Sequence, residues 1–447
     1  MKRLLLVSND RLGERMAGPA IRYYNFAREL ARTFDVTLMV PDAGGVEIEG
    51  VKIVKSNRYG PRAFREFAAS FDALIAQNLR PWTMRALAET KLRVIYDLYD
   101  PYLVENLGFF AHYEGSRAFR EVEYRANALL QEIALATGDA FVCASDRQRD
   151  FWLGMLGALG RVDTTQYTRD PALRELVEVV PFGLPADPPE APKRVLKGVV
   201  DGIGENDRVL LWGGGIWNWF DPLTVIRAVA RLAEQRRDVK LYFLGVRHPS
   251  SETPEMVMTE RAVELARDLD VIDRSVFFNF GWVPYQERAA FFLEADLGVS
   301  AHFDNVETRY AFRTRMLDYL WAGLPIVASA GDVLADLVTE RNLGRSVAVG
   351  DVDGWVRAIS ELLDDDAEYG RVQANVEQTR PQFTWPVVVE PLARFAAEPG
   401  APVHGDRSVT LMVVRYLGLA VRSVALRFGI RGVLRHAFQV LFRPRVP

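Results

Sequence analysis

The chain has 447 residues, of which 49% are hydrophobic and 26% charged, and its formal net charge is −4. This composition is typical of a soluble globular protein with two or three domains, and it excludes a disordered or collagen-like chain. The single cysteine, Cys143, excludes an internal disulfide framework and a cysteine-rich zinc site. The small net charge argues against a chain-wide nucleic-acid surface, so no nucleic-acid partner is expected.

Short apolar runs alternate with helical patterns over the first part of the chain. Leu4–Val7 is too short for a secretory segment and predicts a buried strand that leads into a polar loop, Ser8–Gly18. Four similar runs follow, with helical stretches such as 116–136 between them: Val36–Val40, Ala73–Ala76, Arg93–Tyr96 and Ala140–Ala144. Strands buried on both faces that alternate with helices indicate a parallel sheet with helices on both sides.

The same alternation restarts after 183–207, a segment rich in proline and glycine that suits a linker. Val209–Leu211 predicts a strand that leads into Gly213–Gly215, and a helix is predicted from Pro222 to about Glu234. The remaining predicted elements are the strands Lys240–Leu244, Val276–Phe280, Leu297–Ser300 and Ile326–Ala328 and a helix at about Thr314–Ala322. The chain is therefore predicted to be an α/β protein with two doubly wound domains, whose strand ends can face each other across a cleft.

Five segments, in the same order, resemble retaining glycosyltransferases of family 4, which have the GT-B fold. In the main segment, RMLDYLWAGLPIV at 315–327, Asp318 stands where that family usually has glutamate. The other four are Gly18–Arg22, Val180–Gly183, Leu211–Gly215 and Phe280–Pro284. The resemblance covers about residues 1–398. It implies an enzyme of GT-B architecture that moves a sugar from a nucleotide-diphosphate sugar to an acceptor hydroxyl with retention.

The resemblance also implies a division of the chain into parts. An acceptor-side Rossmann-like domain spans 1–185 and a nucleotide-sugar donor domain spans 186–375. A crossover helix at 376–400 returns to the first domain, and 401–447 forms a basic amphipathic tail. Two alternatives stay open, a non-catalytic GT-B-like scaffold at a membrane and a nucleotide-sugar epimerase. The scaffold is considered because two residue pairs typical of the family, two glutamates and an arginine with a lysine, are missing.

The resemblance gives Asp318 the role of accepting hydrogen bonds from both ribose hydroxyls; the alternative is an ordinary solvated helix acid. Three arginines precede Asp318 and suit the binding of a diphosphate: Arg309, Arg313 and Arg315. Tyr310, which follows Arg309, is a further candidate for contact with the donor. In the alternative, one or two of these arginines are ion-paired residues. The family places a glutamate eight residues before the second acid, where this chain has Tyr310. Glu307 is the nearest acid and the candidate for contact with the sugar.

Backbone and aromatic groups are expected to complete the donor site. Gly214 and Gly215 allow the backbone to approach a ligand closely. Trp217 and Trp219 follow them and either wall the sugar or belong to the core. The resemblance places Trp282 and Val283 against the nucleotide base.

In the first domain, the predicted ligand contacts are Gly18 and Arg22, which opens a helix and can reach the phosphates. Asp97 and Asp100 end a strand, and either can orient the acceptor hydroxyl, with Asp100 as the candidate catalytic residue; the alternative is helix capping before Pro101. No metal and no resident cofactor are expected. Asp351 and Asp353 have a spacing that is common by chance, and His302 is expected to be structural.

The tail at 401–447 differs in charge from the rest of the chain. It holds eight arginines and one acid, a formal charge of +7, which leaves −11 on residues 1–400. Arg415 and Arg422 are seven residues apart, so a helix would carry both on one stripe beside a long apolar face. This pattern predicts contact with an anionic membrane surface, a lipid-linked acceptor and a cytoplasmic protein on the inner membrane face. The alternative is a helical arm packed on the acidic body or on another subunit.

Overall fold

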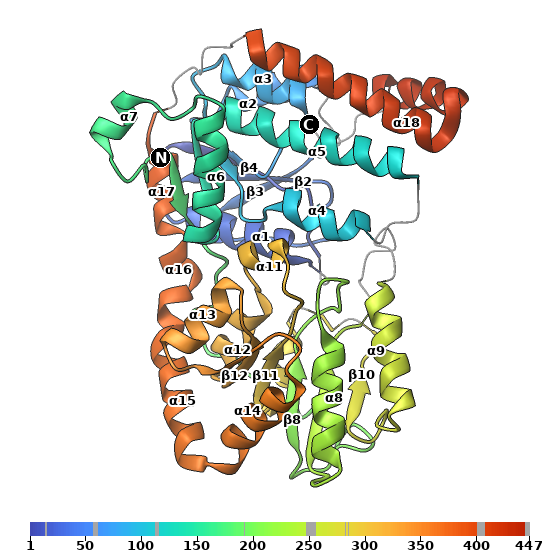
Figure 1. Ribbon diagram of the computed structural model, residues 1–447. Coiled ribbons are helices and arrows are strands. Elements are labelled where there is room, and N and C mark those ends of the chain that lie inside the picture. The colour runs from blue at the N-terminus through green and yellow to red at the C-terminus, as the bar shows by residue number, and fades with distance from the viewer. Residues whose placement is uncertain are drawn as a thin grey trace. The chain divides into compact units, whose positions relative to one another are not determined.

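The computed structural model describes residues 1–13, 16–56, 61–111, 116–191, 193–246, 256–281, 283–284, 286–399 and 407–442. The chain folds into two compact units. The first consists of Met1–Pro181 together with Val388–Pro447, and the second consists of Phe182–Val387. Each unit is built around one parallel sheet with helices packed on it (Figure 1).

The sheet of the first unit has seven strands, all parallel, in the order β3-β2-β1-β4-β5-β6-β7. These strands are β1 (Arg3–Val7), β2 (Asp35–Val40), β3 (Val51–Lys55), β4 (Ala73–Ala76), β5 (Arg93–Asp97), β6 (Ala140–Cys143) and β7 (Val177–Val179). The central strands β4, β5 and β6 are buried along their whole length, as expected for strands covered on both faces.

The helices of this unit follow the strands in βαβ order. Within the described residues they are α1 (Gly18–Leu30), α2 (Pro61–Ala68), α3 (Pro81–Ala88), α4 (Tyr102–Ala111), α5 (Arg117–Thr137), α6 (Asp146–Ala158), α7 (Thr164–Arg169), α17 (Glu390–Ala397) and α18 (Arg407–Phe442). α17 contacts β4, β5 and β7, so the last part of the chain completes the first unit. Cys143 is fully buried in the core, and burial raises the pKa of its thiol to about 12.

The sheet of the second unit has six parallel strands in the order β10-β9-β8-β11-β12-β13. These strands are β8 (Arg208–Trp212), β9 (Val239–Phe243), β10 (Val276–Phe278), β11 (Leu297–Ser300), β12 (Ile326–Ser329) and β13 (Gly344–Val347). The described helices are α8 (Pro222–Ala233), α9 (Val257–Asp268), α10 (Arg288–Glu294), α11 (Val306–Tyr310), α12 (Arg315–Ala322), α13 (Val333–Glu340), α14 (Val352–Asp364) and α15 (Asp366–Thr379).

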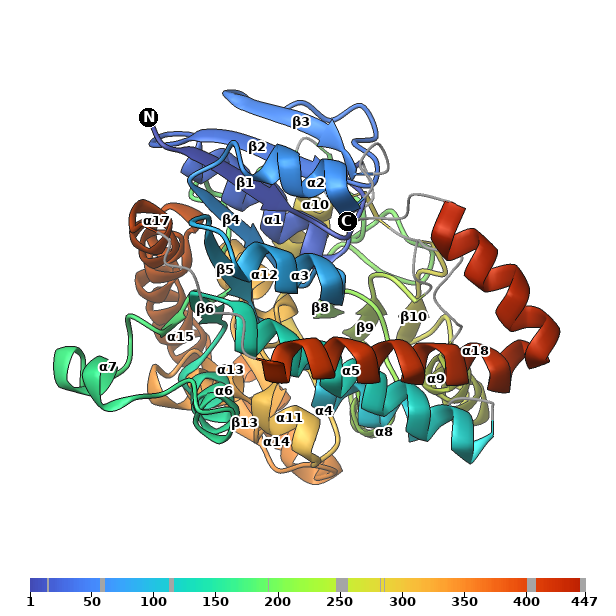
Figure 2. The same cartoon turned by 90° about the horizontal axis from the view of Figure 1, so that it is seen from above.

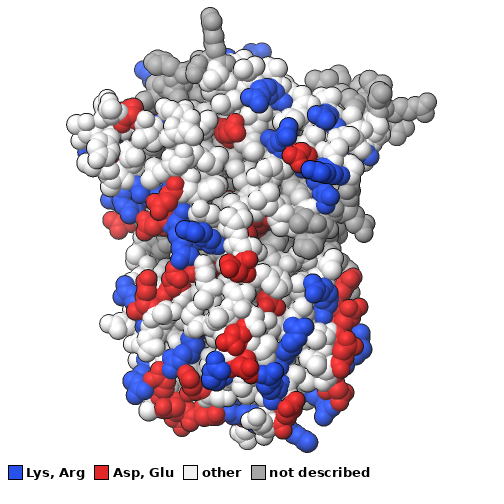
Figure 3. Space-filling view, viewed as in Figure 1, with Lys and Arg blue, Asp and Glu red and all other residues white. Residues whose placement is uncertain are grey.

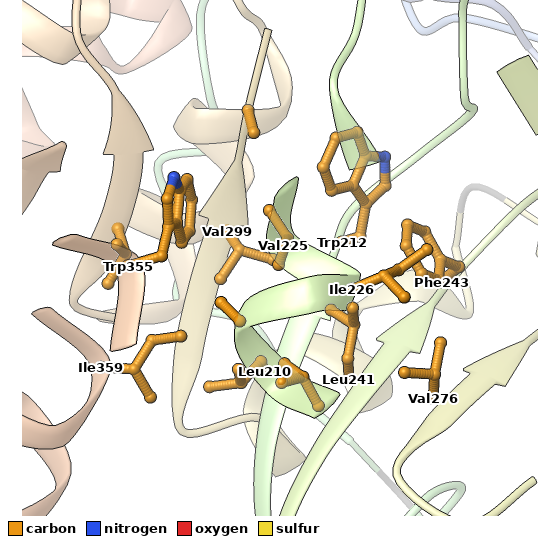
Figure 4. Packing of buried hydrophobic residues seen from close by; sticks show 14 of the residues in the cluster. Leu210, Trp212, Val225, Ile226, Leu241, Phe243, Val276, Val299, Trp355 and Ile359 are labelled. Atoms are coloured by element: carbon orange, nitrogen blue, oxygen red, sulfur yellow. The ribbon is translucent and has the colours of Figure 1, made fainter. Parts of the chain in front are cut away.

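The core of the second unit lies between this sheet and the helices α8, α9 and α14 (Figure 4). Leu210, Leu241 and Val299 from three neighbouring strands are fully buried there, and Trp355 of α14 packs against the same cluster. On the face of this unit that Figure 3 shows, lysines and arginines lie next to aspartates and glutamates. The basic side chains of that described surface are therefore interleaved with acidic ones.

The crossover helix predicted at 376–400 is not one continuous helix. The chain there forms a 3₁₀ turn (η2, Arg380–Phe383), a short α16 (Trp385–Val388) and then α17. Pro386 and Pro391 explain the breaks, because proline lacks the N–H that a continuous helix requires and is tolerated in the first turn. Pro391 indeed lies in the first turn of α17.

Candidate functional site

The second unit has a topological switch point at its centre. β8 lies between β9 and β11, so the strand order reverses between β8 and β11. Ligands of open α/β sheets bind at such a point, beyond the carboxyl ends of the strands. Three segments begin there: Gly213–Gly215 after β8, the residues from Ala301 after β11 and those from Ala330 after β12.

The glycine loop, Gly213–Gly215, combines a tightly packed residue with an open one. A Cβ at Gly213 would lie 3.1 Å from the Phe292 ring and 3.2 Å from the Tyr319 ring. Gly214 has a φ of +98°, and a Cβ there would have no atom within 4 Å. The loop is therefore fixed at its first residue, whereas its second has the space for a ligand to approach the backbone.

The Tyr319 hydroxyl anchors the glycine loop. It accepts a hydrogen bond from the Gly213 N–H at 2.8 Å and lies 2.9 Å from the Leu211 carbonyl oxygen and 2.8 Å from that of Val299. Its proton can go to either carbonyl. Tyr319 is fully buried, and burial raises the pKa of its hydroxyl to about 12. One side chain of α12 thus ties together the ends of β8 and β11.

Replacing Tyr319 with phenylalanine is expected to lower the free energy of unfolding by about 1–3 kcal/mol, because the Gly213 N–H would lose its buried acceptor. Urea unfolding of the full chain measures the loss. Tyr369→Phe is the matched control, because that hydroxyl donates to the Asp296 carbonyl oxygen at 2.9 Å, outside the glycine loop. A loss no larger than that of the control would show that the hydroxyl does not hold the loop.

Arg315, the first residue of α12, places a cation beside the glycine loop. Its Nη2 donates to the Gly215 carbonyl oxygen at 2.9 Å, and its guanidinium lies over the rings of Phe220 and Trp212, 4.0 and 4.9 Å from their centroids. Its Nη1 is buried and has no hydrogen-bond partner within the described residues. Burial lowers the pKa of Arg315 to about 10, so it remains charged at neutral pH. A half-buried cation with a buried, unused donor suits an anion.

A second arginine, Arg313, is held in a buried ionic cluster. Its two terminal nitrogens donate to the two carboxylate oxygens of Glu307 at 2.8 and 2.6 Å, a bidentate pair. Glu307 is 8% exposed and Arg313 is 6% exposed. The sequence predicted that Glu307 contacts the sugar, but both its oxygens are hydrogen-bonded to Arg313. The pair is fixed by burial, since a charge away from water needs a partner.

Asp332 and His302 complete this group of four residues, which we call the Arg313 cluster. Asp332 caps α13, with its Oδ1 accepting from the N–H groups of Leu334 and Ala335 at 2.8 and 2.7 Å. Its Oδ2 lies 3.2 Å from His302 Nε2 and 3.9 Å from Arg313 Nε. His302 and Asp332 are fully buried. The expectation of a structural role for His302 agrees with this placement.

Asp318 lies in the first turn of α12 and forms an ion pair with Arg288 of α10, 3.1 Å apart. Burial raises the pKa of Asp318 and the charge of Arg288 lowers it, with burial the larger effect. The Arg288 guanidinium also lies 5.3 Å from the centroid of the Trp321 ring. Arg288 was not predicted as a site residue, because nothing in its local sequence links it to Asp318.

The other predicted donor residues of this unit have different surroundings. Trp217 and Trp219 stack on each other, 5.2 Å apart and nearly parallel, and Trp219 belongs to the hydrophobic core. The core alternative is therefore correct for Trp219. Arg309 is exposed and Tyr310 half-buried on α11, and Val283 is half-buried. Trp282 lies outside the described residues.

In the first unit, Arg22 and Asp97 form a fully buried ion pair. Nε and Nη2 of Arg22 donate to the two oxygens of Asp97, both at 2.8 Å, and its remaining bonds go to the carbonyl oxygens of Val180 and Pro181. The prediction that Arg22 reaches a phosphate is wrong in this structure, because its side chain has no exposed surface. Both carboxylate oxygens of Asp97 accept hydrogen bonds from Arg22.

Gly18 and Asp100 remain as candidates in this unit. Gly18 begins α1 rather than ending a loop, and a Cβ there would lie 3.7 Å from the Tyr99 hydroxyl, an ordinary contact. Asp100 is half-buried after β5, and its carbonyl oxygen accepts a hydrogen bond from the Tyr102 N–H at 2.8 Å.

Comparison with known families identifies the part of the chain that contains the switch-point site. Residues 207–365 match the family described as glycosyl transferases group 1. The match lies within the second unit and covers most of it. The matched range includes the glycine loop, Arg315, Asp318 and the Arg313 cluster.

Curated proteins similar to this chain include two that are named D-inositol 3-phosphate glycosyltransferase. The protein of Corynebacterium diphtheriae is 24% identical over 191 residues, and that of Corynebacterium aurimucosum is 26% identical over 200 residues. The matches cover 43% and 44% of this chain and 42% and 44% of the relatives. The chain thus spans less than half the length of the curated relatives it matches.

Solved structures similar to this chain extend the likeness to both units. WaaG, a glycosyltransferase involved in lipopolysaccharide biosynthesis, superposes with a TM-score of 0.61 at 16% identity, over 88% of this chain and 99% of its own. Anabaena Alr3699/HepE in complex with UDP and glucose also gives 0.61, at 13% identity and with the same coverage. This likeness shows the fold, and it confirms the predicted GT-B architecture of two Rossmann-like domains.

Proposed function

We propose that the protein is a glycosyltransferase that moves a sugar from a nucleotide-diphosphate sugar to an acceptor hydroxyl. The observation that carries the proposal is the half-buried Arg315, whose buried and unused Nη1 donor lies beside the open glycine loop at the switch point. The group 1 match and the UDP-sugar complexes of a structural relative support it. The retaining course of the reaction is proposed on the resemblance of 315–327 to family 4.

In this proposal the main task of the site is to stabilise the leaving diphosphate. The negative charge on that group grows as the bond to the sugar breaks, and a fixed cation in a site with little water is most effective there. Arg315 supplies the charge, and the N–H groups of Gly214 and Gly215 supply further donors. The charge of Arg313 is balanced by Glu307 and Asp332, so Arg313 acts mainly by positioning the segment before Arg315.

The acceptor hydroxyl is proposed to belong to a lipid-linked molecule at the inner face of the membrane, such as a glycan precursor. The support is the +7 tail at 401–447, which would bring the enzyme to an anionic surface. Asp100, half-buried at the end of β5, is proposed to orient that hydroxyl. The nucleotide-sugar is the only small molecule that this reaction requires besides the acceptor.

Asp318 is proposed to accept hydrogen bonds from the ribose hydroxyls, which makes UDP binding depend on pH. Only the carboxylate accepts two hydroxyl donors, so affinity should fall as pH drops through the pKa of Asp318. Burial raises that pKa and Arg288 lowers it. In Arg288→Gln the attraction is lost and burial remains, so affinity should be lost at a higher pH than in the wild type.

Isothermal titration of both proteins with UDP from about pH 4 to about pH 8 measures this shift. UDP itself titrates in this range, but equally for every variant, so the difference between proteins reports on Asp318. Asp318→Asn is the control, and adding Arg288→Gln to it should produce no further shift. Identical pH profiles for Arg288→Gln and the wild type would contradict the ribose assignment.

The function itself is tested by titration with nucleoside diphosphates and then by a panel of nucleotide-sugars with membrane lipid extracts. Binding of one diphosphate, followed by transfer of its sugar to a lipid, is the expected result. No binding at all would favour the non-catalytic scaffold. Conversion of a nucleotide-sugar to its epimer without any lipid would favour the epimerase.

A further inference from the structure

The long helix α18 is docked on the first unit by one face. Figures 1 and 2 show its first part running alongside α5, which it contacts more than any other element. Val409 and Val413 are buried, and Val413 belongs to the hydrophobic core of this unit. The Ser423 hydroxyl hydrogen-bonds with Glu123 of α5, and Arg85 of α3 donates to the Thr410 hydroxyl at 2.8 Å. These contacts fix the orientation of the helix about its axis.

The opposite face of α18 exposes large apolar side chains, which we call the outer stripe. Their spacing of three, four and seven residues puts them on one side of a helix. The stripe consists of Leu411, Val414, Leu417, Val421 and Phe428, which are 59%, 59%, 44%, 54% and 54% exposed. Exposed apolar side chains gathered on one face mark a contact surface, unlike scattered single ones. The docked inner face shows that the stripe is not needed to hold the helix on the body.

Basic side chains accompany the outer stripe. Arg415 and Arg422 are exposed and lie two turns apart, next to the stripe, and Arg427 is exposed beyond them. The sequence from Arg407 to Phe442 contains no aspartate or glutamate. An apolar stripe edged only by arginines is complementary to an anionic lipid surface, where apolar side chains enter the acyl boundary and arginines meet headgroups.

The length and composition of α18 alone would also allow it to cross a membrane. Ser408–Gly429 is the described segment that is long and apolar enough to cross a membrane, and 17% of it is buried in the fold. Crossing would require α18 to leave α5 and to carry Arg415 and Arg422 into the hydrocarbon, which is costly. Gly429, with a φ of +69°, also bends the helix at the end of this segment. These observations favour a helix that lies along the surface.

We propose that the outer stripe and its arginines lie in the plane of an anionic bilayer while the inner face of α18 stays docked on α5. The first unit, which carries the proposed acceptor residue, is thereby held at the membrane. The biological role of this membrane contact rests on the proposed transfer of a sugar to a lipid-linked acceptor. The contact itself can be measured without turnover.

The first test is flotation of the full-length protein with vesicles of phosphatidylcholine containing about 30% phosphatidylglycerol, and with phosphatidylcholine alone. The wild type should float with the anionic vesicles and much less with the neutral ones. Val414→Ser/Val421→Ser should lower the partition coefficient at least tenfold. Arg415→Gln and Arg422→Gln should each lower it about fivefold, which corresponds to ~1 kcal/mol per arginine. Val199→Ser/Val257→Ser, also exposed apolar positions, is the matched control and should float like the wild type.

The second test distinguishes a surface helix from a spanning one. Because Cys143 is fully buried, a cysteine introduced at Leu411, Val414 or Val421 can be spin-labelled selectively. All three labels should report the same shallow depth in anionic vesicles. A label at the bilayer centre would overturn the in-plane placement. Unchanged flotation of the Val414→Ser/Val421→Ser variant would overturn the membrane as the partner of the stripe. A wild type that is a dimer without vesicles, together with a stripe variant that is a monomer, would show that a second copy of the chain covers the stripe instead.

UDP titration of the same preparations separates this inference from the proposed function. The stripe and arginine variants should bind UDP like the wild type, since α18 belongs to the first unit and the proposed donor site to the second. Flotation without UDP binding would leave the membrane contact standing and the proposed glycosyl transfer refuted. UDP binding without flotation would refute only the membrane contact.

Discussion

Replacing Arg315 with alanine is expected to lower kcat/KM with the cognate nucleotide-sugar by roughly 100-fold or more and to weaken UDP binding strongly. Loss of one preorganised donor to a developing negative charge has effects of about that size. Arg315 is half-buried and has two features that a surface arginine lacks: a fixed position over the Phe220 ring and a buried Nη1 donor that no described residue uses. Steady-state kinetics and UDP titration measure the effect.

Two further variants make this experiment specific. Arg315→Lys keeps the charge but loses the planar group that lies over Phe220, so it should recover only part of the activity. Arg341→Ala removes an exposed arginine of the same unit and should behave like the wild type. If Arg315→Ala binds UDP as tightly as the wild type and circular dichroism shows an intact fold, Arg315 does not belong to the donor site.

The fold was largely predictable because its central strands are continuous apolar runs. β4, β5 and β11 are buried on both faces and were predicted at or near their observed bounds. β3, β7 and β13 were missed, and all three are edge strands. β7 is only three residues long, β3 has only half-buried and exposed residues, and β13 mixes buried residues with half-buried and exposed ones. A strand with only one neighbour and a partly exposed face has no apolar run, so a pattern search based on burial does not detect it.

The candidate site was predictable where one short segment carries it. The glycine loop and the residues Arg313, Arg315 and Asp318 were found because glycines and charges stand close to strand ends and helix starts in the sequence. Arg288 and Asp332 were missed, since they meet their partners only through folding. The same limit explains the error for Arg22, whose partner Asp97 lies 75 residues away. Sequence spacing shows which groups are present, and the fold decides which of them are already paired.

The largest effect on stability is expected in the Arg313 cluster. Arg313→Met would leave the buried carboxylates of Glu307 and Asp332 without their arginine, at a cost of about 3–5 kcal/mol in the free energy of unfolding. Glu307→Leu should also be destabilising, because the longer contact of Arg313 with Asp332 would be its remaining ion pair within the described residues. The double variant Arg313→Met/Glu307→Leu removes both charges of the bidentate pair and should recover most of the loss. Calorimetric unfolding of the three variants measures the coupling.

A surface pair provides the comparison for this cycle. Arg231 and Asp353 form an ion pair with side chains that are 48% and 67% exposed, so breaking it should cost no more than about 1 kcal/mol. If the losses of the two Arg313-cluster single variants simply add in the double variant, the pair is not the stabilising unit.

Once stability is restored in the double variant, its remaining activity reports on catalysis alone. Near wild-type activity would mean that Glu307 and Arg313 only position the chain. A loss of about 100-fold in kcat with intact UDP binding would mean that they contact the reacting sugar.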